Sequence, residues 1–187
     1  PERTSTIPVV GDSSPPSATA PVLALRSGSS LGAGLNSVGT WAAASDEAGT
    51  IARYEVRWRV DGSLGSPTTL AASTRQASRR MKTDHTYALR LRARDAAGNW
   101  SPWVESTPFA PVLSQDTSPT LARSGGWTRY RRSWMSGGTS LYSRTRGKWV
   151  ERSFTGRAIA LVGSKSPGRG KAKVYIDGVL AATVDFR

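Results

Sequence analysis

The residues best suited to binding chemistry lie in one stretch, Arg129 to Trp149, which reads RYRRSWMSGGTSLYSRTRGKW. It holds six basic residues and no acidic one, and its aromatic residues are Tyr130, Trp134, Tyr142 and Trp149. Basic grooves with stacking aromatic side chains bind nucleic acids, and exposed aromatic faces flanked by polar groups bind sugars. The stretch therefore predicts binding of a polyanion or of a glycan, unless its side chains only form the wall of a β-sandwich.

The sequence contains few residues of the types that catalyse reactions or bind metals. The absence of cysteine excludes disulfides, zinc–thiolate sites and cysteine nucleophiles, and the one histidine, His85, has no second histidine to share a metal. Residues 113–187 contain four carboxylates, of which no two suggest a glycosidase pair. We therefore expect no enzyme activity, no metal and no cofactor in these residues.

Two strings look like ligand loops but fail in their details. GSKSPGRGK, from Gly163 to Lys171, lacks the Ser or Thr after its lysine, and its flanks read as strands, whereas a phosphate loop needs the start of a helix. We expect a flexible connection between strands there. Asp95 and Asn99, in RDAAGN, offer fewer oxygens than the roughly six to eight that calcium takes.

The positive charge is concentrated in the second half of the chain. The net charge is +13, and 12 basic against 9 acidic residues give +3 for residues 1–112, while 14 against 4 give +10 for residues 113–187. A positive surface of this size attracts anionic polymers and anionic cell envelopes, although it carries no information about fold. Arginine also outnumbers lysine 21 to 5, as a GC-rich genome would encode.

Short strands are the elements that must position these residues, since Gly, Pro and Ser are frequent and no long helical periodicity occurs. ARYEVRWRVDG alternates strictly and closes on an Asp61-Gly62 turn, with one face formed by Tyr54, Val56, Trp58 and Val60. HTYALRLRARD alternates in the same way, with one face formed by Tyr87, Leu89, Leu91 and Ala93. We expect an all-β protein.

Residues 19–110 resemble a fibronectin type III-like domain of secreted proteins from high-GC bacteria. The resemblance rests on RYEVRW and on TYALRLRARDAAGNWSPW. It implies a seven-strand immunoglobulin-like sandwich in which Tyr87 forms a tyrosine corner, Trp41 and Trp58 fill the core, and residues 95–99 turn the chain before the last strand. Residues 1–18, PERTSTIPVVGDSSPPSA, have the composition of a disordered Pro/Ser-rich linker.

One position departs from this pattern. Arg79 falls where an apolar residue is expected, two places before Met81. Either the strand is shifted along the sequence, or the aliphatic stem of Arg79 lies inside the sandwich while its charged end reaches solvent.

A second module is expected at residues 127–187, after a linker at 111–126. Its expected strands are SLYS, KWVERSF, RAIALVG, KAKVYI and VLAATVDF, and Asp177-Gly178 between the last two is a strong hairpin signal. In that hairpin we expect Val174 and Ile176 to share a face with the alternate residues of the returning strand, Leu180, Ala182, Val184 and Phe186.

The strings RSFTGRAIA and GRGKAKVYIDG resemble the first part of a jelly-roll, galactose-binding-like module of secreted bacterial proteins. The family carries further strands that close its sheets. The resemblance therefore implies a partial jelly-roll sandwich, truncated at its C-terminus, with an unpaired edge and an exposed core.

Alternation along these strands predicts which aromatic residues are free to bind. The resemblance places Tyr142 and Phe154 inward, so Trp149 faces out, while Arg152 takes a position where an apolar residue is expected. Trp127 is expected to pack at the start of the module. Trp134 lies in a loop beside a Gly-Gly pair, where it either binds a ligand or caps the sandwich. The candidate ligand-binding residues are Trp134, Trp149, Arg131 and Arg132.

These observations predict a non-catalytic accessory region of a secreted or cell-surface bacterial protein. It would consist of a fibronectin-like spacer and a module that binds a polysaccharide or cell-envelope glycan. The alternative is binding of an anionic polymer, namely teichoic acid, sulfated glycan or nucleic acid, through the basic second half. No stretch is apolar enough for a transmembrane segment. We expect a monomer within a longer chain, whose parent could be a hydrolase with its catalytic domain elsewhere.

Overall fold

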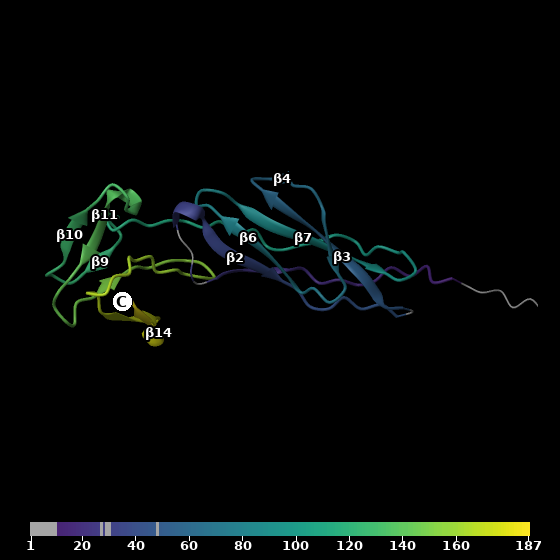
Figure 1. Cartoon of the computed structure of the whole chain (residues 1–187). Helices are drawn as coiled ribbons and strands as arrows, with labels where there is room; N and C mark the ends of the chain where they lie inside the picture. The colour runs from purple at the N-terminus through teal and green to yellow at the C-terminus, as the bar shows by residue number, and fades with distance from the viewer. Residues whose placement is uncertain (1–10, 27, 29–30, 48) are drawn as a thin grey trace, which may run out of the picture. The chain divides into compact units, whose positions relative to one another are not determined.

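The computed structural model describes residues 11–26, 28, 31–47 and 49–187. Apart from two short 3-10 helices, η1 (Leu31–Ala33) and η2 (Ser136–Gly138), its regular structure is β, so the all-β prediction is confirmed. The chain divides into two compact units, unit 1 (Pro1–Leu113) and unit 2 (Ser114–Arg187) (Figure 1). Among the described residues, none of the helices has the length and apolar character that crossing a membrane requires.

Two antiparallel sheets form unit 1. The smaller has the order β1 (Val22–Leu25), β2 (Leu35–Thr40) and β6 (Gln76–Met81). The larger has the order β4 (Ser63–Leu64), β3 (Ile51–Val60), β7 (Tyr87–Asp95) and β8 (Val104–Glu105), and β5 (Thr68–Ala71) also pairs with β3. Together they make a β-sandwich (Figure 1).

The core of this sandwich comes from the alternating residues of β3 and β7. Tyr54, Leu89 and Leu91 are each 0% exposed, and Val56 is 3% exposed, which confirms the predicted inward faces of both strands. Leu89 lies against Gly39 of the opposite sheet, where an added Cβ would be only 2.4 Å from its Cδ2 atom. Glycine at position 39 is therefore what lets the two sheets approach at this point.

Buried tyrosines in this core have partners for their hydroxyl groups. The Tyr87 hydroxyl accepts a hydrogen bond from the backbone N–H of Lys82 at 2.9 Å, which ties the start of β7 to the residues that precede it. The Tyr54 hydroxyl accepts one from the N–H of Ala44 at 2.8 Å. Trp41, 6% exposed, packs with its ring centroid 5.9 Å from that of Tyr54. Each tyrosine therefore fills the core with its hydroxyl paired, whereas the buried indole N–H of Trp41 has no hydrogen-bond partner among the described residues.

Arg79 lies on the inward face of β6 without any shift of the strand. It is paired in register with Ser37 of β2, and its half-buried side chain follows Ala77 and precedes Met81 on the same face. Its guanidinium lies 5.6 Å from the ring centroid of Trp58 and 5.7 Å from that of Tyr87. The strand is therefore not shifted, and the aliphatic stem of Arg79 lies inside the sandwich.

The segment expected to be a linker splits into two parts. Residues 1–10 lie outside the described residues, but residues 12–18 contact the sandwich, so the linker prediction is wrong there. Pro16 is fully buried, and Ser17 exchanges backbone hydrogen bonds of 2.8 and 3.0 Å with Ser45. The Asn99 amide also donates to the carbonyl of Asp12 at 3.1 Å. Burial of the proline ring and pairing of the backbone outweigh the linker-like composition.

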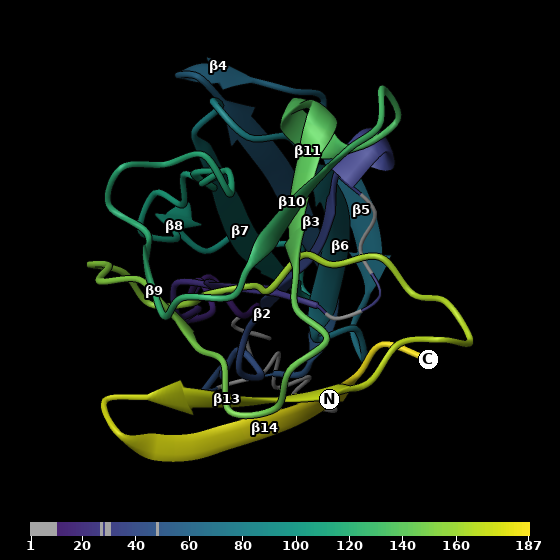
Figure 2. The same cartoon turned by 90° about the vertical axis from the view of Figure 1, so that its left-hand side faces the viewer.

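Unit 2 consists of three separate antiparallel pairs. They are β9 (Ala122–Arg123) with β12 (Val150–Glu151), β10 (Thr128–Arg131) with β11 (Thr139–Tyr142), and β13 (Lys171–Ile176) with β14 (Val179–Asp185). Figure 2 shows the last pair as a long ribbon distinct from the β10–β11 pair. Strand β9 and its neighbours lie in the segment expected to link the modules.

No residue of unit 2 is buried, and several expectations fail for this reason. Phe154, expected to point inward, is 43% exposed, and Tyr142 is only half-buried. The segment RAIALVG forms no strand, and its Ile159 and Leu161 are 48% and 59% exposed. A strand at this position needs a neighbouring strand to pair with its backbone, and none of the described strands lies in register beside it.

The predicted hairpin at Asp177-Gly178 is confirmed. Both residues have positive φ, 49° and 80°, as the tight two-residue turn of a twisted hairpin requires. This turn places Ile176 opposite Val179 and Tyr175 opposite Leu180, so the expected facing of Ile176 and Leu180 is wrong. The register shifts between Val174 and Tyr175, and this shift places Val174 opposite Ala182, in agreement with the expected facing of these two residues.

Candidate binding site

The chain between β10 and β11 forms a closed turn that carries three of the four candidate residues. We call residues 131–138 the basic turn. Its backbone bonds to itself, with N–H···O distances of 3.0 Å from Arg132 to Gly138, 3.1 Å from Met135 to Arg132 and 2.9 Å from Gly138 to Met135. Gly137 has φ 65°, and an added Cβ there would lie 2.8 Å from the Gln115 side-chain oxygen. A side chain at this position would therefore disrupt the turn.

Two residues before β9 hold the basic turn from outside. The Gln115 amide donates to the Ser136 hydroxyl at 2.8 Å. The Asp116 carboxylate accepts hydrogen bonds from the Thr139 hydroxyl at 2.5 Å and from Nε of Arg129 at 3.2 Å. These contacts fix both ends of the turn, and such supporting contacts are what a pre-organised binding site needs.

The two arginines of the basic turn keep their charge available. Arg129 is paired with Asp116, and the remaining ion pairs of unit 2 join Lys171 and Arg187 to Asp185, so among the described residues neither Arg131 nor Arg132 has an ion-pair partner. The Arg132 guanidinium lies over the Tyr130 ring, 4.1 Å from its centroid, and donates to the Arg131 carbonyl at 2.8 Å. Arg132 is therefore oriented by the protein, although its charge is not neutralised.

Trp134 lies between these arginines and η2, and its side chain is 67% exposed. Capping of the sandwich would require the indole to cover other residues, which an exposure this large does not fit. An exposed indole presents a flat apolar face, and the same turn carries the guanidinium groups of Arg131 and Arg132, which are hydrogen-bond donors. This combination can bind a sugar ring or an anionic group.

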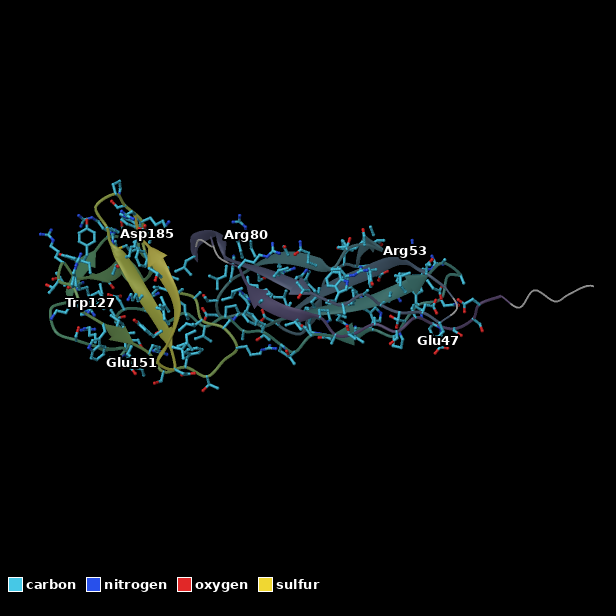
Figure 3. The ribbon with its side chains drawn as sticks, turned by 90° about the horizontal axis from the view of Figure 1, so that it is seen from below. Glu47, Arg53, Arg80, Trp127, Glu151 and Asp185 are labelled. Carbon is cyan, nitrogen blue, oxygen red and sulfur yellow. The ribbon has the colours of Figure 1, made fainter. Side chains whose placement is uncertain are left out.

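Trp149 belongs to a different part of unit 2. It is 50% exposed, as expected, but the adjacent Val150 is 41% exposed, so alternation does not separate two faces here. The Trp149 N–H donates to the Ser124 hydroxyl, and the Trp149 carbonyl accepts from the Ser124 N–H. Its carbonyl accepts a hydrogen bond at 3.1 Å from the indole N–H of Trp127, which is labelled in Figure 3.

The structure does not bring Trp149 and Trp134 into one rim. Trp127 precedes the first residue of β10, and Trp134 follows the last. Trp149 is bonded to Trp127, so it lies at the far end of β10 from the basic turn, about 13 Å away at ~3.3 Å per residue along the strand. Trp127 was not a candidate, because it was expected to pack at the start of the module; its contact with Trp149 joins residues 22 positions apart, which no local pattern indicates.

Three carboxylates converge at one end of unit 1, a feature that the sequence did not suggest. Oxygens of Asp12, Asp46 and Asp95 all lie within 4.8 Å of one another. Burial raises the pKa of Asp95, but hydrogen bonds from the Asn99 side chain and from backbone N–H groups outweigh it, so the pKa is lowered overall. Asp12 and Asp46 come from segments distant in sequence from Asp95, so no local pattern links the three carboxylates.

Arginine side chains pack against Trp100 and Trp103 of unit 1. The Arg92 guanidinium lies 4.0 Å from the ring centroid of Trp100 and 4.6 Å from that of Trp103, and it forms an ion pair with Glu55 at 3.1 Å. Arg53, labelled in Figure 3, lies 5.4 Å from the Trp100 centroid. These residues form a stacked layer on the outer face of β3 and β7. Guanidinium groups thus lie over the rings of both tryptophans, which leaves less of these rings free for a ligand.

Comparisons with known proteins give limited similarities. No model of a known protein family matches the chain. Over 83 residues, 44% of its length, the chain is 36% identical to the A type blood N-acetyl-α-D-galactosamine deacetylase of Flavonifractor plautii. The matched residues span only 10% of the length of that deacetylase. The solved "Myokine structure" shares 21% identity and a TM-score of 0.35, over 52% of this chain and 100% of that one, which is too low to carry an argument.

Proposed function

We propose that the chain is a non-catalytic accessory region of a secreted or cell-surface bacterial protein, and that unit 2 binds a glycan. The observation that carries this proposal is the exposed indole of Trp134, which follows Arg131 and Arg132 on one turn whose conformation is fixed by other residues. Binding sites for small ligands and sugars combine such an apolar surface with a few placed polar groups.

We propose that unit 1 is a spacer domain of the fibronectin type III-like kind. The support is its sheet order, with β1, β2 and β6 opposite β4, β3, β7 and β8, together with the Tyr87 hydroxyl that bonds to the backbone upstream. The stacked layer around Arg92 also supports a rigid spacer, because it covers the outer face of the larger sheet.

We propose that unit 2 is part of a jelly-roll, carbohydrate-binding-like module. The support is the resemblance of its sequence and the exposure of its apolar residues, among them Ile159, Leu161 and Val179. In a jelly roll, such residues face a second sheet that covers them.

The deacetylase relative supports a carbohydrate-related role. By its name, that enzyme acts on an N-acetyl-α-D-galactosamine group, and this chain corresponds to a small part of it. We therefore propose that the parent protein acts on carbohydrate through a catalytic domain outside these residues, and that the accessory region holds it on its substrate.

A binding screen tests the proposal. The whole chain is run in affinity electrophoresis through gels that contain cell-wall or plant polysaccharides. We expect retardation by at least one of them, most of which is lost in Trp134→Ala. Trp149→Ala should cause a smaller loss, since Trp149 lies apart from the basic turn. A chain that is folded by circular dichroism and is retarded by none of these polysaccharides would contradict glycan binding.

Polyanion binding is the second candidate, favoured by the net charge of +10 in residues 113–187. If duplex DNA were the ligand, the binding constant would fall with salt with a log–log slope of about 0.9 per neutralised phosphate. Binding to DNA that is absent, or independent of salt, rejects nucleic acid as the polyanion. We rank it second because one exposed indole beside the arginines provides a platform for one ring, whereas nucleic-acid strands stack on several.

A further inference from the structure

We infer that the glycan bound at the basic turn is acidic, with a carboxylate or sulfate group on the sugar unit that stacks on Trp134. This inference rests on the proposed glycan binding and adds the chemical class of the ligand.

The first argument is the unequal neutralisation of neighbouring arginines. Arg129 is paired with Asp116, whereas Arg131 and Arg132 have no ion-pair partner among the residues that the structure describes. A neutral sugar hydroxyl can accept a hydrogen bond from a guanidinium but leaves its charge uncompensated. A carboxylate or sulfate accepts hydrogen bonds from the guanidinium in matched, paired geometry and also neutralises its charge.

The second argument is the orientation of Arg132. Stacking over Tyr130 at 4.1 Å and the hydrogen bond to the Arg131 carbonyl restrict its side chain before any ligand arrives. The free energy of ordering this side chain is therefore mostly supplied by folding, so it does not weaken binding. The planar guanidinium also presents parallel N–H groups that match the two oxygens of a carboxylate or sulfate.

The third argument is the field around the turn. Unit 2 carries few carboxylates, and two of them, Asp116 and Asp185, are already engaged by basic residues. The potential at the basic turn is therefore positive, which raises the local concentration of anionic ligands. Because Trp149 lies at the other end of β10, the turn offers one stacking surface, and this favours a single sugar ring over a run of bases.

Matched pairs of polysaccharides test the inference on the whole chain. Polygalacturonate is compared with its fully methyl-esterified form, which keeps the ring but loses the charge, and dextran sulfate is compared with dextran. The two pairs distinguish a carboxylate ligand from a sulfate ligand. We expect the acidic member of at least one pair to bind about tenfold more tightly or better, the difference that one charge-assisted hydrogen bond provides.

Variants locate the effect. Arg131→Gln and Arg132→Gln should each weaken binding of the acidic polysaccharide by about tenfold. Arg144→Gln is the matched control, because it removes the same charge from an exposed residue beyond the opposite end of β11. It should change binding by less than about twofold, since charges more than ~10 Å away are largely screened at moderate salt.

The outcomes separate the two proposals. Equal binding of charged and neutral partners, lost in Trp134→Ala, would leave glycan binding in place and overturn the acidic ligand. Equal weakening by Arg132→Gln and Arg144→Gln, or binding of duplex DNA as tight as that of the acidic polysaccharide, would also overturn it. Failure to bind any polysaccharide would overturn glycan binding itself. Near-ultraviolet circular dichroism of each variant shows that the fold is kept.

Discussion

Units 1 and 2 use the same kinds of residue in opposite ways. In unit 1, Arg92 lies between the rings of Trp100 and Trp103 and pairs with Glu55, so that arginine and aromatic side chains cover one another. In unit 2, Trp134 is 67% exposed beside Arg131 and Arg132, which have no described ion-pair partner. A basic and aromatic composition therefore does not identify a binding surface, because pairing between strands decides which side chains remain free.

The units also differ in packing. Unit 1 has a continuous core in which Tyr54, Leu89 and Leu91 are 0% exposed, whereas no residue of unit 2 is buried. Its three strand pairs are not joined into a larger sheet. An isolated two-stranded pair is at best marginally stable in water, so packing stabilises unit 1 far more than unit 2.

A matched pair of leucine substitutions gives the largest expected effect. Leu89→Ala should lower the free energy of unfolding of unit 1 by about 3 kcal/mol, because it removes a fully buried side chain and leaves a cavity beside Gly39. Leu180→Ala, at a residue 50% exposed, should change the stability of unit 2 by less than about 0.5 kcal/mol.

Hydrogen exchange read by mass spectrometry measures each unit separately. If Leu89→Ala and Leu180→Ala caused equal losses of protection in their respective units, the proposed difference in packing between the units would be wrong. Strong protection of β13 and β14 in the unsubstituted chain would mean that unit 2 is packed more tightly than its exposed residues indicate.

A matched pair of arginine substitutions should have an intermediate effect. Arg92→Gln should lower the stability of unit 1 by about 1 kcal/mol, because it removes two cation–π contacts and an ion pair at a half-buried position. Arg132→Gln should leave the thermal unfolding midpoint nearly unchanged and act on ligand binding. Urea denaturation followed by tryptophan fluorescence provides the measurement, and a larger destabilisation by Arg132→Gln would assign that arginine a structural role.

Much of unit 1 could be predicted because its strands carry their own pattern. Strict alternation identified the inward faces of β3 and β7, and the Asp177-Gly178 signal identified the hairpin of unit 2. The apolar run RAIALVG forms no strand, since an apolar segment forms one only when another strand pairs with its backbone. Composition failed for residues 12–18, where one buried proline and two backbone bonds attach a linker-like segment to the sandwich.

The sequence identified the aromatic residues of the candidate site but not the contacts that support them. Trp134 and Trp149 are both exposed, although the loop position of Trp134 left its exposure open, and strand parity does not explain that of Trp149, because the adjacent Val150 is 41% exposed as well. The two tryptophans are separated because β10 lies between them. The basic turn is fixed by Gln115 and Asp116, which belong to a segment that was expected to be a linker. Such contacts join residues distant in sequence, for which no local pattern exists.

The smallest expected effect is a difference between the units in how their stability changes as the pH falls. In unit 1, the hydrogen bond from Arg59, together with the charges of Arg59 and Arg90, lowers the pKa of Glu105, and hydrogen bonds around Asn99 lower the pKa of the otherwise buried Asp95. A lowered folded-state pKa contributes stability above the ordinary value of about 4, and this contribution is lost as the pH falls through the folded-state pKa. We therefore expect unit 1 to lose stability as the pH falls from about 4.5 toward 2.

In unit 2, Arg187 also lowers the pKa of Asp185 through hydrogen bonds, but the two residues are neighbours in sequence. Because the two residues are only two apart, their charges attract each other in the unfolded chain as well, and only the cross-strand charge of Lys171 requires the hairpin. We therefore expect the stability of unit 2 to depend less on pH in this range than that of unit 1. Thermal unfolding from pH 5 to pH 2, read by hydrogen exchange for each unit, checks this difference. Glu105→Gln should flatten the pH dependence of unit 1, and Asp185→Asn should leave that of unit 2 unchanged. A steeper dependence in unit 2 would show that the Asp185–Arg187 pair forms only on folding.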